Sequence, residues 1–399
     1  MIATTTSFLS MTILFQLLSA ILYTGDIQYL GSTSYPTRDL AVYHDDRVQK
    51  TYLYAAQGVT VAIYDTTDPM KPAFRKRFVV SSDSVHDVYL WKNRLYTASG
   101  GAGIHVFHID NPENPERISS ISTTADEVWA GQSVVLAINR HPSSSGGGSA
   151  GTTYEHTIYE YDASSLLQQP VQRGEESIQG SESYYTPTFL WAHETLGNRF
   201  FIYSSAMLGL SINVLPGSGT YTSHNTLIRF DEGSEITRQL NSMIFDLGLA
   251  YIAFEEGFLE IHDFTRQEGS TIISRFNIDA PQRLFLDGER IFLQDKENRI
   301  FEIDHTDVRH LKSNFIKPNP FAVQQMKNGT AYGISTRGNI LIQTLDRDSS
   351  LLQLYTEIFP ADCIYNLDDR IIGQTQREND PESSIEFNEI IFKIGRAHV

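Results

Sequence analysis

Apolar and polar positions alternate in short runs along this chain, and the clearest run covers residues 51–72. Residues 52–56 alternate as a half-buried strand does, a Gln-Gly pair then turns the chain, and residues 59–64 are mostly β-branched and aromatic. Asp65 ends this second strand, and the Asp-Pro pair at Pro69 prevents a strand from continuing. The pattern predicts an antiparallel hairpin followed by a tight turn.

The same pattern recurs along the chain, each time with a strand that ends in Asp. These strands end at Asp65, Asp110, Asp162, Asp231, Asp263, Asp304 and Asp346. One strand precedes each of them, a shorter strand precedes that one, and a looser fourth strand follows several of the Asp turns. We name the four strands A, B, C and D in chain order. With about 40–60 residues per unit, the A strands are expected to begin near Arg38, His86, Asp126, Pro187, Ser242, Gln282, Pro320 and Asp362.

Four strands repeated in this way predict an all-β fold, a β-propeller of eight four-stranded blades around an axis. Seven blades are the alternative, if the fourth or fifth unit has been divided too finely. The eighth unit offers strands near 364–367, 370–373 and 389–393 but no fourth strand. Residues 27–33 have the pattern of a D strand, so we expect them to complete this last blade and close the ring, which would remove an exposed edge.

The turn that follows the C strands carries a motif. Residues 65–72 match the pattern D-x-[ST]-[DN]-P-x-x-P, and residues 110–115 match it with one residue fewer. In this motif the chain resembles the LVIVD-repeat β-propeller family, most closely over residues 25–120. The resemblance implies a secreted or surface propeller with no assigned reaction, and it carries over no catalytic residues.

Charge and cysteine content narrow the range of partners. The formal net charge of −17 argues against binding to a nucleic-acid backbone, whereas an acidic surface favours cations or basic partners. Cys363 is the single cysteine, so neither an intrachain disulfide nor a cysteine-based metal cluster can form.

Both ends of the chain carry segments that do not belong to the repeat. Residues 8–22 form an apolar run of signal-peptide size, shorter than the ~20 residues that span a bilayer, so residues 1–24 are expected to be a signal peptide or an N-terminal anchor. Residues 25–394 are assigned to the propeller. Residues 394–399 resemble translated sequencing-adapter sequence, and we place no site there. The expected location is secreted, cell-surface or periplasmic, with the cytoplasm as the alternative.

Charged side chains gather where the A strands begin, and this is the candidate site. In a propeller the A strands line the central channel, and units eight, one, two and three would be neighbours in a closed ring. Long B-to-C connections at 140–156, 206–225 and 374–384 lie on the same face, and loops on a rigid scaffold often bind ligands. The candidate residues for binding a ligand or cation at the channel mouth are Arg38, Asp39, His86, Asp87, Asp126, Glu127, Arg283 and Asp362.

Other interpretations of these residues stay open. The carboxylates could hold a Ca²⁺-like cation, or a metal could bind His86 together with Asp39 and Asp87. They could instead cap the backbone of the D-to-A turns, and Arg38 and His86 could form structural ion pairs.

Two other short patterns have structural explanations. His105 and His108 lie three residues apart on one strand, so they face opposite sides and cannot easily share a metal. Residues 328–330 read Asn-Gly-Thr, which is a formal glycosylation site, but Asn-Gly between two strands is also the favoured hairpin turn.

These observations predict a non-catalytic binding scaffold, secreted or on the cell surface. We expect a protein or a small basic or cationic ligand at its loop-rich, acidic face, a monomeric state, no nucleic acid, and membrane contact only through an N-terminal anchor. No cofactor is expected, apart from Ca²⁺ if the carboxylates hold a metal. The alternative is a Ca²⁺-dependent, lactonase- or hydrolase-like propeller enzyme, which needs a metal or an acid/base pair within hydrogen-bond reach.

Overall fold

The computed structural model describes residues 36–69, 71–131, 134–143, 153–165, 171–181, 187–195, 198–205, 209–216, 224–228, 240–263, 271–319, 321–336, 338–345, 352–354, 364–367, 370–375 and 386–390. Within them the strands form seven four-stranded sheets and one three-stranded sheet, all antiparallel, and in each sheet the strands are paired in chain order. We number the sheets 1 to 8 along the chain. The predicted unit of four consecutive strands is therefore confirmed for sheets 1 to 7.

The strands of sheets 1 to 4 are β1 (Thr37–Asp45), β2 (Lys50–Gln57), β3 (Thr60–Asp65) and β4 (Ala73–Val79); β5 (Asp87–Trp91), β6 (Arg94–Ala98), β7 (Ile104–His108) and β8 (Glu116–Ile121); β9 (Glu127–Ala130), β10 (Val134–Ser143), β11 (Thr153–Asp162) and β12 (Gln172–Ser181); and β13 (Pro187–Thr195), β14 (Asn198–Ser205), β15 (Gly209–Pro216) and β16 (His224–Ile228).

The strands of sheets 5 to 8 are β17 (Leu240–Asp246), β18 (Leu249–Phe254), β19 (Phe258–Asp263) and β20 (Thr271–Asn277); β21 (Pro281–Asp287), β22 (Arg290–Asp295), β23 (Arg299–Asp304) and β24 (Lys312–Pro318); β25 (Val323–Lys327), β26 (Thr330–Ile334), β27 (Ile340–Thr344) and β28 (Leu352–Leu354); and β29 (Ile364–Leu367), β30 (Arg370–Thr375) and β31 (Glu386–Ile390). A short 3₁₀ helix, η1 (Ala163–Ser165), follows β11.

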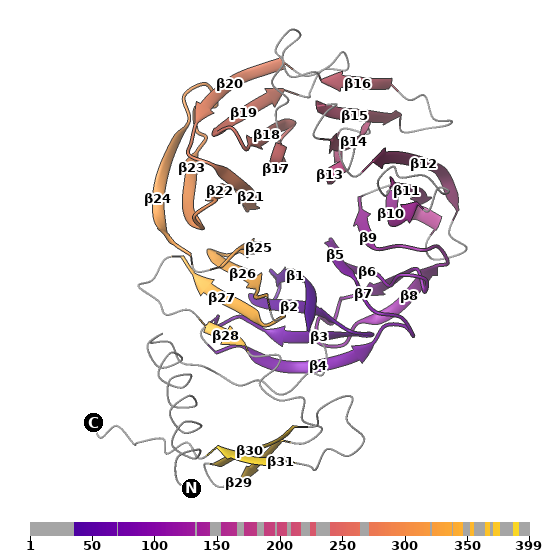
Figure 1. Cartoon of the computed structure of the whole chain (residues 1–399), viewed down its shortest axis with the longest axis vertical. Coiled ribbons are helices and arrows are strands. Elements are labelled where there is room, and N and C mark those ends of the chain that lie inside the picture. The colour runs from indigo at the N-terminus through magenta and orange to yellow at the C-terminus, as the bar shows by residue number, and fades with distance from the viewer. Residues whose placement is uncertain are drawn as a thin grey trace, which may run out of the picture.

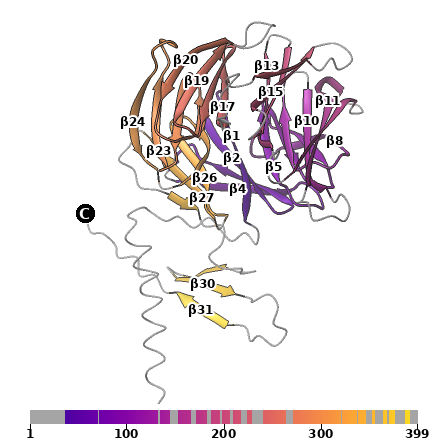
Figure 2. The same cartoon turned by 45° about the horizontal axis from the view of Figure 1, so that its top comes forward.

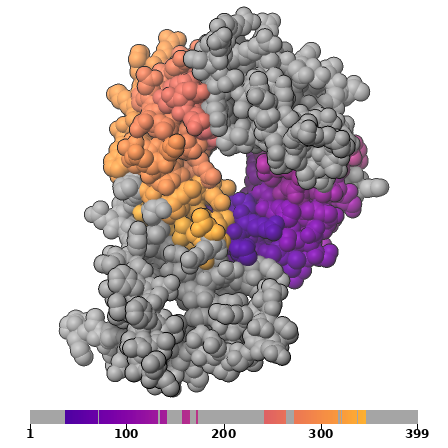
Figure 3. Space-filling model, viewed as in Figure 1, coloured from indigo at the N-terminus to yellow at the C-terminus, as the bar shows by residue number. Residues whose placement is uncertain are grey.

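Sheets 1 to 7 lie side by side around a central space, with the first strand of each sheet innermost and the last strand outermost (Figure 1). An opening remains near the centre when the atoms are drawn at full size (Figure 3). The middle strands are buried on both faces: in β2 every residue from Thr51 to Gln57 is buried, whereas the outer strand β4 is mostly exposed. The expectation of a half-buried strand at 52–56 was wrong, because neighbouring sheets cover both of its faces.

Sheet 1 packs directly against sheet 7. Leu40 and Leu53 of sheet 1 share a buried cluster with Tyr332 of sheet 7. The Tyr332 hydroxyl oxygen lies 3.2 Å from Thr66 Oγ1. The backbone N–H of Thr37 donates to the carbonyl of Gly338 at 3.1 Å. This packing leaves no room for another sheet between sheets 1 and 7.

Sheet 8 lies apart from the seven others in both views of the fold (Figures 1 and 2). The preferred count of eight blades is therefore not confirmed. The alternative of seven blades assumed that the fourth or fifth unit had been divided too finely. Units four and five are separate sheets, however, and the eighth unit is the one that lies apart from the others. The strand predicted to close the ring, residues 27–33, lies outside the described residues.

The predicted end segments, residues 1–24 and 394–399, also lie outside the described residues. Among the residues that are described, no helix has the length and apolar character needed to cross a bilayer.

Candidate functional site

The predicted acidic residues come together at the starts of three neighbouring A strands. Asp39 lies near the start of β1, Asp87 begins β5, and Glu127 begins β9. These three strands are neighbours near the centre of the ring, where β1 contacts β5 and β5 contacts β9 (Figure 1). His86 and Asp126 directly precede β5 and β9, so the structure assembles five of the eight predicted site residues.

The carboxyls of this cluster bind the backbone of the next sheet. Asp39 Oδ2 accepts a hydrogen bond from the Val88 N–H at 3.0 Å, and Asp87 Oδ2 accepts one from the Val128 N–H at 2.7 Å. Val88 and Val128 are both 3% exposed. Because a buried N–H without an acceptor costs about 1–3 kcal/mol, each carboxyl joins its own sheet to the following one.

Residues at the same strand position in sheets 5 and 6 do the same with other chemistry. Ser242 Oγ accepts from the Leu284 N–H at 3.0 Å, and Arg283 Nη1 donates to the Val323 carbonyl at 2.6 Å. The predicted site residue Arg283 therefore belongs to a sheet two places round the ring from sheet 1, and it is not part of the acidic cluster. An interpretation as a backbone cap was considered for the carboxylates, and Asp39 and Asp87 each bind the backbone of the following residue in their own strand as well as that of the next sheet.

Asp39 and Asp87 are also hydrogen-bonded to each other through their side chains. Two carboxyl groups can bond in this way only when they share a proton. Burial raises the pKa of Asp39, and burial together with the Asp39 charge raises the pKa of Asp87 well above its usual range. The pair therefore keeps a proton at pH values where an exposed carboxyl has lost it.

The remaining members of the cluster hold the base of an extended hairpin. His86 Nδ1 lies 2.9 Å from Asp126 Oδ1, and the other oxygen of Asp126 accepts from the Arg140 N–H at 2.8 Å. Arg140 Nη2 lies 2.5 Å from Glu127 Oε1. Burial raises the pKa of Glu127, and the positive charge of Arg140 opposes that shift. Arg140 is thus held at two points, by Asp126 just before β9 and by Glu127 at its first position.

The structure does not bring the other predicted residues into the cluster. Arg38 is exposed on β1, and Asp362 lies outside the described residues. Within the part of the chain that is described, no group of three or more His, Cys, Asp or Glu side chains is placed to hold a metal ion.

The two histidines of β7 have separate partners. His105 Nδ1 lies 3.3 Å from Ser120 Oγ, whereas His108 Nδ1 lies 3.1 Å from Asp110 Oδ2. His105 is 6% exposed, and burial, with a smaller contribution from Arg117, lowers its pKa to about 4. His105 is therefore a neutral side chain of the core at physiological pH.

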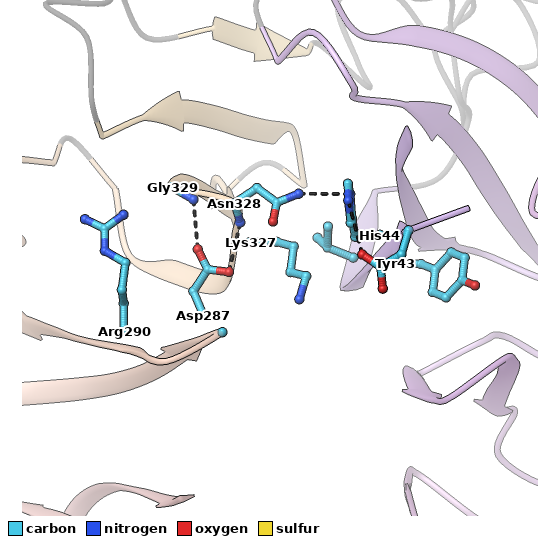
Figure 4. A pocket seen from close by; sticks show the side chains of 10 residues that line it. Tyr43, His44, Asp287, Arg290, Lys327, Asn328 and Gly329 are labelled. Atoms are coloured by element: carbon cyan, nitrogen blue, oxygen red, sulfur yellow. Dashed lines mark hydrogen bonds and ion pairs between the residues drawn. The ribbon is translucent and has the colours of Figure 1, made fainter. Parts of the chain in front are cut away.

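A pocket that the sequence did not predict lies at the other end of the A strands. It has a volume of about 520 Å³ and is formed by the end of β1 and by the turns β21–β22 and β25–β26, where sheets 6, 7 and 1 meet (Figure 4). We call it the seam pocket. Its labelled side chains are Tyr43, His44, Asp287, Arg290, Lys327 and Asn328.

The walls of the seam pocket are joined by hydrogen bonds between sheets. The buried Asp287 carboxylate of sheet 6 accepts from the backbone N–H groups of Asn328 and Gly329 at 2.9 and 2.8 Å. Asn328 Nδ2 in turn lies 2.9 Å from His44 Nδ1 of sheet 1. Asn328 and Gly329 both have positive φ, 50° and 66°, as the predicted Asn-Gly hairpin turn requires.

One local pattern in the sequence identified part of this pocket. The Asn-Gly pair identified the turn, and the turn is confirmed. The contact between His44 and Asn328 spans 284 residues, so no local pattern could have revealed it.

Small antiparallel sheets arranged around an axis define a class of protein, the β-propellers, and the described fold has this geometry. No protein-family model matches the chain, and no curated protein sequence matches it. Among solved structures, it is similar to the computationally designed Ika8 protein, with 9% identity and a TM-score of 0.49 over 86% of this chain and 95% of that chain.

Two natural proteins show a similar degree of likeness. Sqt1 of Saccharomyces cerevisiae has 10% identity and a TM-score of 0.46, over 84% of this chain and 99% of that chain. The WD40 β-propeller domain of Doa1 has 12% identity and a TM-score of 0.43, over 82% of this chain and 96% of that chain. Identities and scores at this level carry no conclusion about function.

Proposed function

We propose that the protein is a non-catalytic binding scaffold that engages a protein partner on the face where the A strands begin. The observation that carries this proposal is the double attachment of Arg140 to Asp126 and Glu127. The charges at the predicted site thereby hold a hairpin in place at the edge of the channel mouth.

That hairpin is longer than the equivalent one in the neighbouring sheet. In sheet 2 the pairing of the two middle strands ends at Ala98 with Ile104, and β6 has 5 residues. In sheet 3, β10 has 10 residues and remains paired with β11 as far as Ser143 with Thr153. β12 continues beside β11 to its own last residue, which supports a three-stranded extension as a contact surface.

A comparison of hairpin variants tests the proposal. In one variant residues 141–155 are replaced by an Asn-Gly turn, which keeps the pair Arg140–His156 and removes the extended part of the hairpin. The control variant is Leu247→Asn, in the β17–β18 turn at the opposite end of the A strands. The proposal predicts that partners recovered with the native chain and with the control are lost with the shortened hairpin. Recovery of the same partners with all three proteins would contradict it.

The rival function, a Ca²⁺-dependent enzyme, is tested by unfolding. A cation that binds only the folded state raises the midpoint by mass action. Thermal unfolding in millimolar Ca²⁺ and in EDTA should give the same midpoint for a scaffold, whereas a clear difference would favour the metal-dependent enzyme.

Several finer features remain part of the proposal. We propose a ring of seven blades, supported by the packing of sheet 1 on sheet 7, and export through residues 1–24, supported by their apolar pattern. Membership of the LVIVD-repeat family rests on the motifs at 65–72 and 110–115 alone. Mass spectrometry of the N-terminus of the protein made by its own cells tests export, which predicts a chain that begins near residue 25.

A further inference from the structure

The seam pocket is large enough for a ligand and has prearranged walls. Its volume of about 520 Å³ falls within the roughly 300–1,000 Å³ of typical ligand pockets. The bonds from Asp287 to the β25–β26 turn, and from Asn328 to His44, fix three of its walls relative to one another. A ligand would therefore enter a site that needs little reordering, which favours binding.

The pocket contains one cation that has no counter-ion among the described residues. Lys327, at the end of β25, is half-buried, and its side chain extends into the space between Asp287 and His44 (Figure 4). No carboxylate of the described residues forms an ion pair with it. Arg290 differs, because its guanidinium lies 2.7 and 3.3 Å from the two oxygens of Glu302 and lies over the ring of Phe292.

The two carboxylates that line the pocket limit the charge of its ligand. Asp287 is satisfied by two backbone N–H groups, and Asp46 is 91% exposed and lies 3.6 Å from His44 Nε2. Lys327 can compensate one negative charge on a ligand, whereas Asp46 and Asp287, which also line the pocket, would repel a second one. A phosphate monoester carries about −1.5 to −2 at pH 7, whereas a carboxylate carries one charge.

His44 adds a hydrogen-bond donor. Its Nδ1 lies 2.9 Å from the Asn328 amide nitrogen, which donates, and 3.0 Å from Thr51 Oγ1, so Nδ1 accepts and Nε2 carries a proton. The Nε2–H is the group that lies near Asp46, at the exposed side of the pocket. It is available to a ligand oxygen that displaces this weak contact.

We propose that the seam pocket is a carboxylate-binding site, in which Lys327 supplies the counter-charge and His44 a hydrogen bond. The carboxylate belongs either to a free organic acid or to an acidic side chain of a protein. The site lies at the opposite end of the A strands from the acidic cluster, so the inference does not depend on the proposed function.

Saturation-transfer NMR titrations of the full chain test the proposal. The probes are 4-fluorophenylacetate, its neutral amide 4-fluorophenylacetamide, and phenyl phosphate. The test variant is Lys327→Gln, and the matched control is Lys92→Gln, in the β5–β6 turn at the same end of the A strands but outside the pocket. Thermal unfolding of each variant checks that the fold is intact.

We expect 4-fluorophenylacetate to bind the native chain and the Lys92→Gln variant equally, and to bind Lys327→Gln at least tenfold more weakly. The amide should bind at least tenfold more weakly than the acid, with no dependence on Lys327. The proposal is overturned if the acid does not bind, if Lys327→Gln binds it as the native chain does, or if phenyl phosphate binds more tightly than the acid.

A second pair of probes identifies the source of the carboxylate. Glutamate capped at both ends as N-acetyl and N-methylamide represents an acidic side chain, and capped glutamine is its neutral control. Binding of the capped glutamate that is lost in Lys327→Gln supports a protein segment as the ligand. Binding of the free acid alone supports a small molecule, and binding of neither overturns the site.

Discussion

The same strand position is occupied by acids on one side of the ring and by other polar groups on the other side. In sheets 1 and 2 it holds Asp39 and Asp87, and in sheets 5 and 6 it holds Ser242 and Arg283. Each of the four binds the backbone of the next sheet. The comparison teaches that the position requires a polar group of suitable reach, and that negative charge is not what joins the sheets.

The two sides differ in their dependence on protons. The hydroxyl of Ser242 has a single protonation state, whereas Asp39 and Asp87 share a proton that can be lost. The acidic side is therefore expected to respond to pH through a group that the other side lacks.

The largest expected effect is that of Asp87→Ala. This change leaves the buried Val128 N–H without its acceptor and removes the partner of Asp39, so we expect a loss of about 1–3 kcal/mol in the free energy of unfolding. Urea unfolding at pH 5 measures it. A loss below about 0.3 kcal/mol would show that the bond to Val128 contributes nothing to the joint.

His105, a buried base in sheet 2, also makes the stability of the acidic side depend on pH, with the opposite sign to the Asp39–Asp87 pair. The pKa of His105 falls from 6.5 to about 4 on folding, so its contribution to stability is present above 6.5 and is lost as pH falls towards 4. Between pH 6.5 and 5 we expect a loss of about 1–2 kcal/mol.

The variant His105→Leu isolates that contribution, since it removes the titrating group and fills the same buried space. Its stability relative to the native chain should rise as pH falls from 6.5 to 5, as measured by urea unfolding at each pH. A constant difference between the two proteins over this range would contradict the assignment.

Ser242→Ala is the matched test on the other side of the ring. The change leaves the Leu284 N–H without its hydroxyl acceptor, and a neutral hydrogen bond of this kind contributes about 1 kcal/mol. The loss should be the same at pH 5 and pH 8, because no titrating group is removed. A pH-dependent loss would remove the contrast between the two sides.

The smallest effect is expected for Arg283→Gln. The Arg283 side chain is exposed, and exposed substitutions generally change stability by no more than about 0.5 kcal/mol. Thermal unfolding of this variant beside Ser242→Ala should give the smaller shift. A larger shift for Arg283→Gln would mean that the hydrogen bond from Arg283 to the Val323 carbonyl contributes more to stability than is expected of an exposed side chain.

Local patterns in the sequence predicted most of the strands and their order within each sheet. Alternation and turn residues act over a few positions, so a hairpin such as that at Asn328 can be recognised without knowing its neighbours. The approach of Asp39, Asp87 and Glu127 was also predictable, because repeated units place equivalent positions side by side around an axis.

Contacts between sheets could not be predicted in the same way. The pattern of residues 364–390 indicates strands, but only the packing of Leu40 against Tyr332 shows that sheet 1 follows sheet 7. A carboxylate in the sequence also does not reveal its partner. Asp39 was considered as a metal ligand, and it binds the backbone N–H of Val88, 49 residues away.

The most direct test of the central claim is the free energy of unfolding of Asp87→Asn and the native chain at pH 5 and pH 8. The carboxamide can accept from the Val128 N–H and donate to Asp39, as the protonated acid does. Because the folded pKa values of Asp39 and Asp87 are raised, native stability is lost as pH rises through them. We predict that Asp87→Asn is at least as stable as the native chain at pH 8, with a smaller advantage at pH 5. An equal loss of stability at both pH values would show that the charge of Asp87 is itself required.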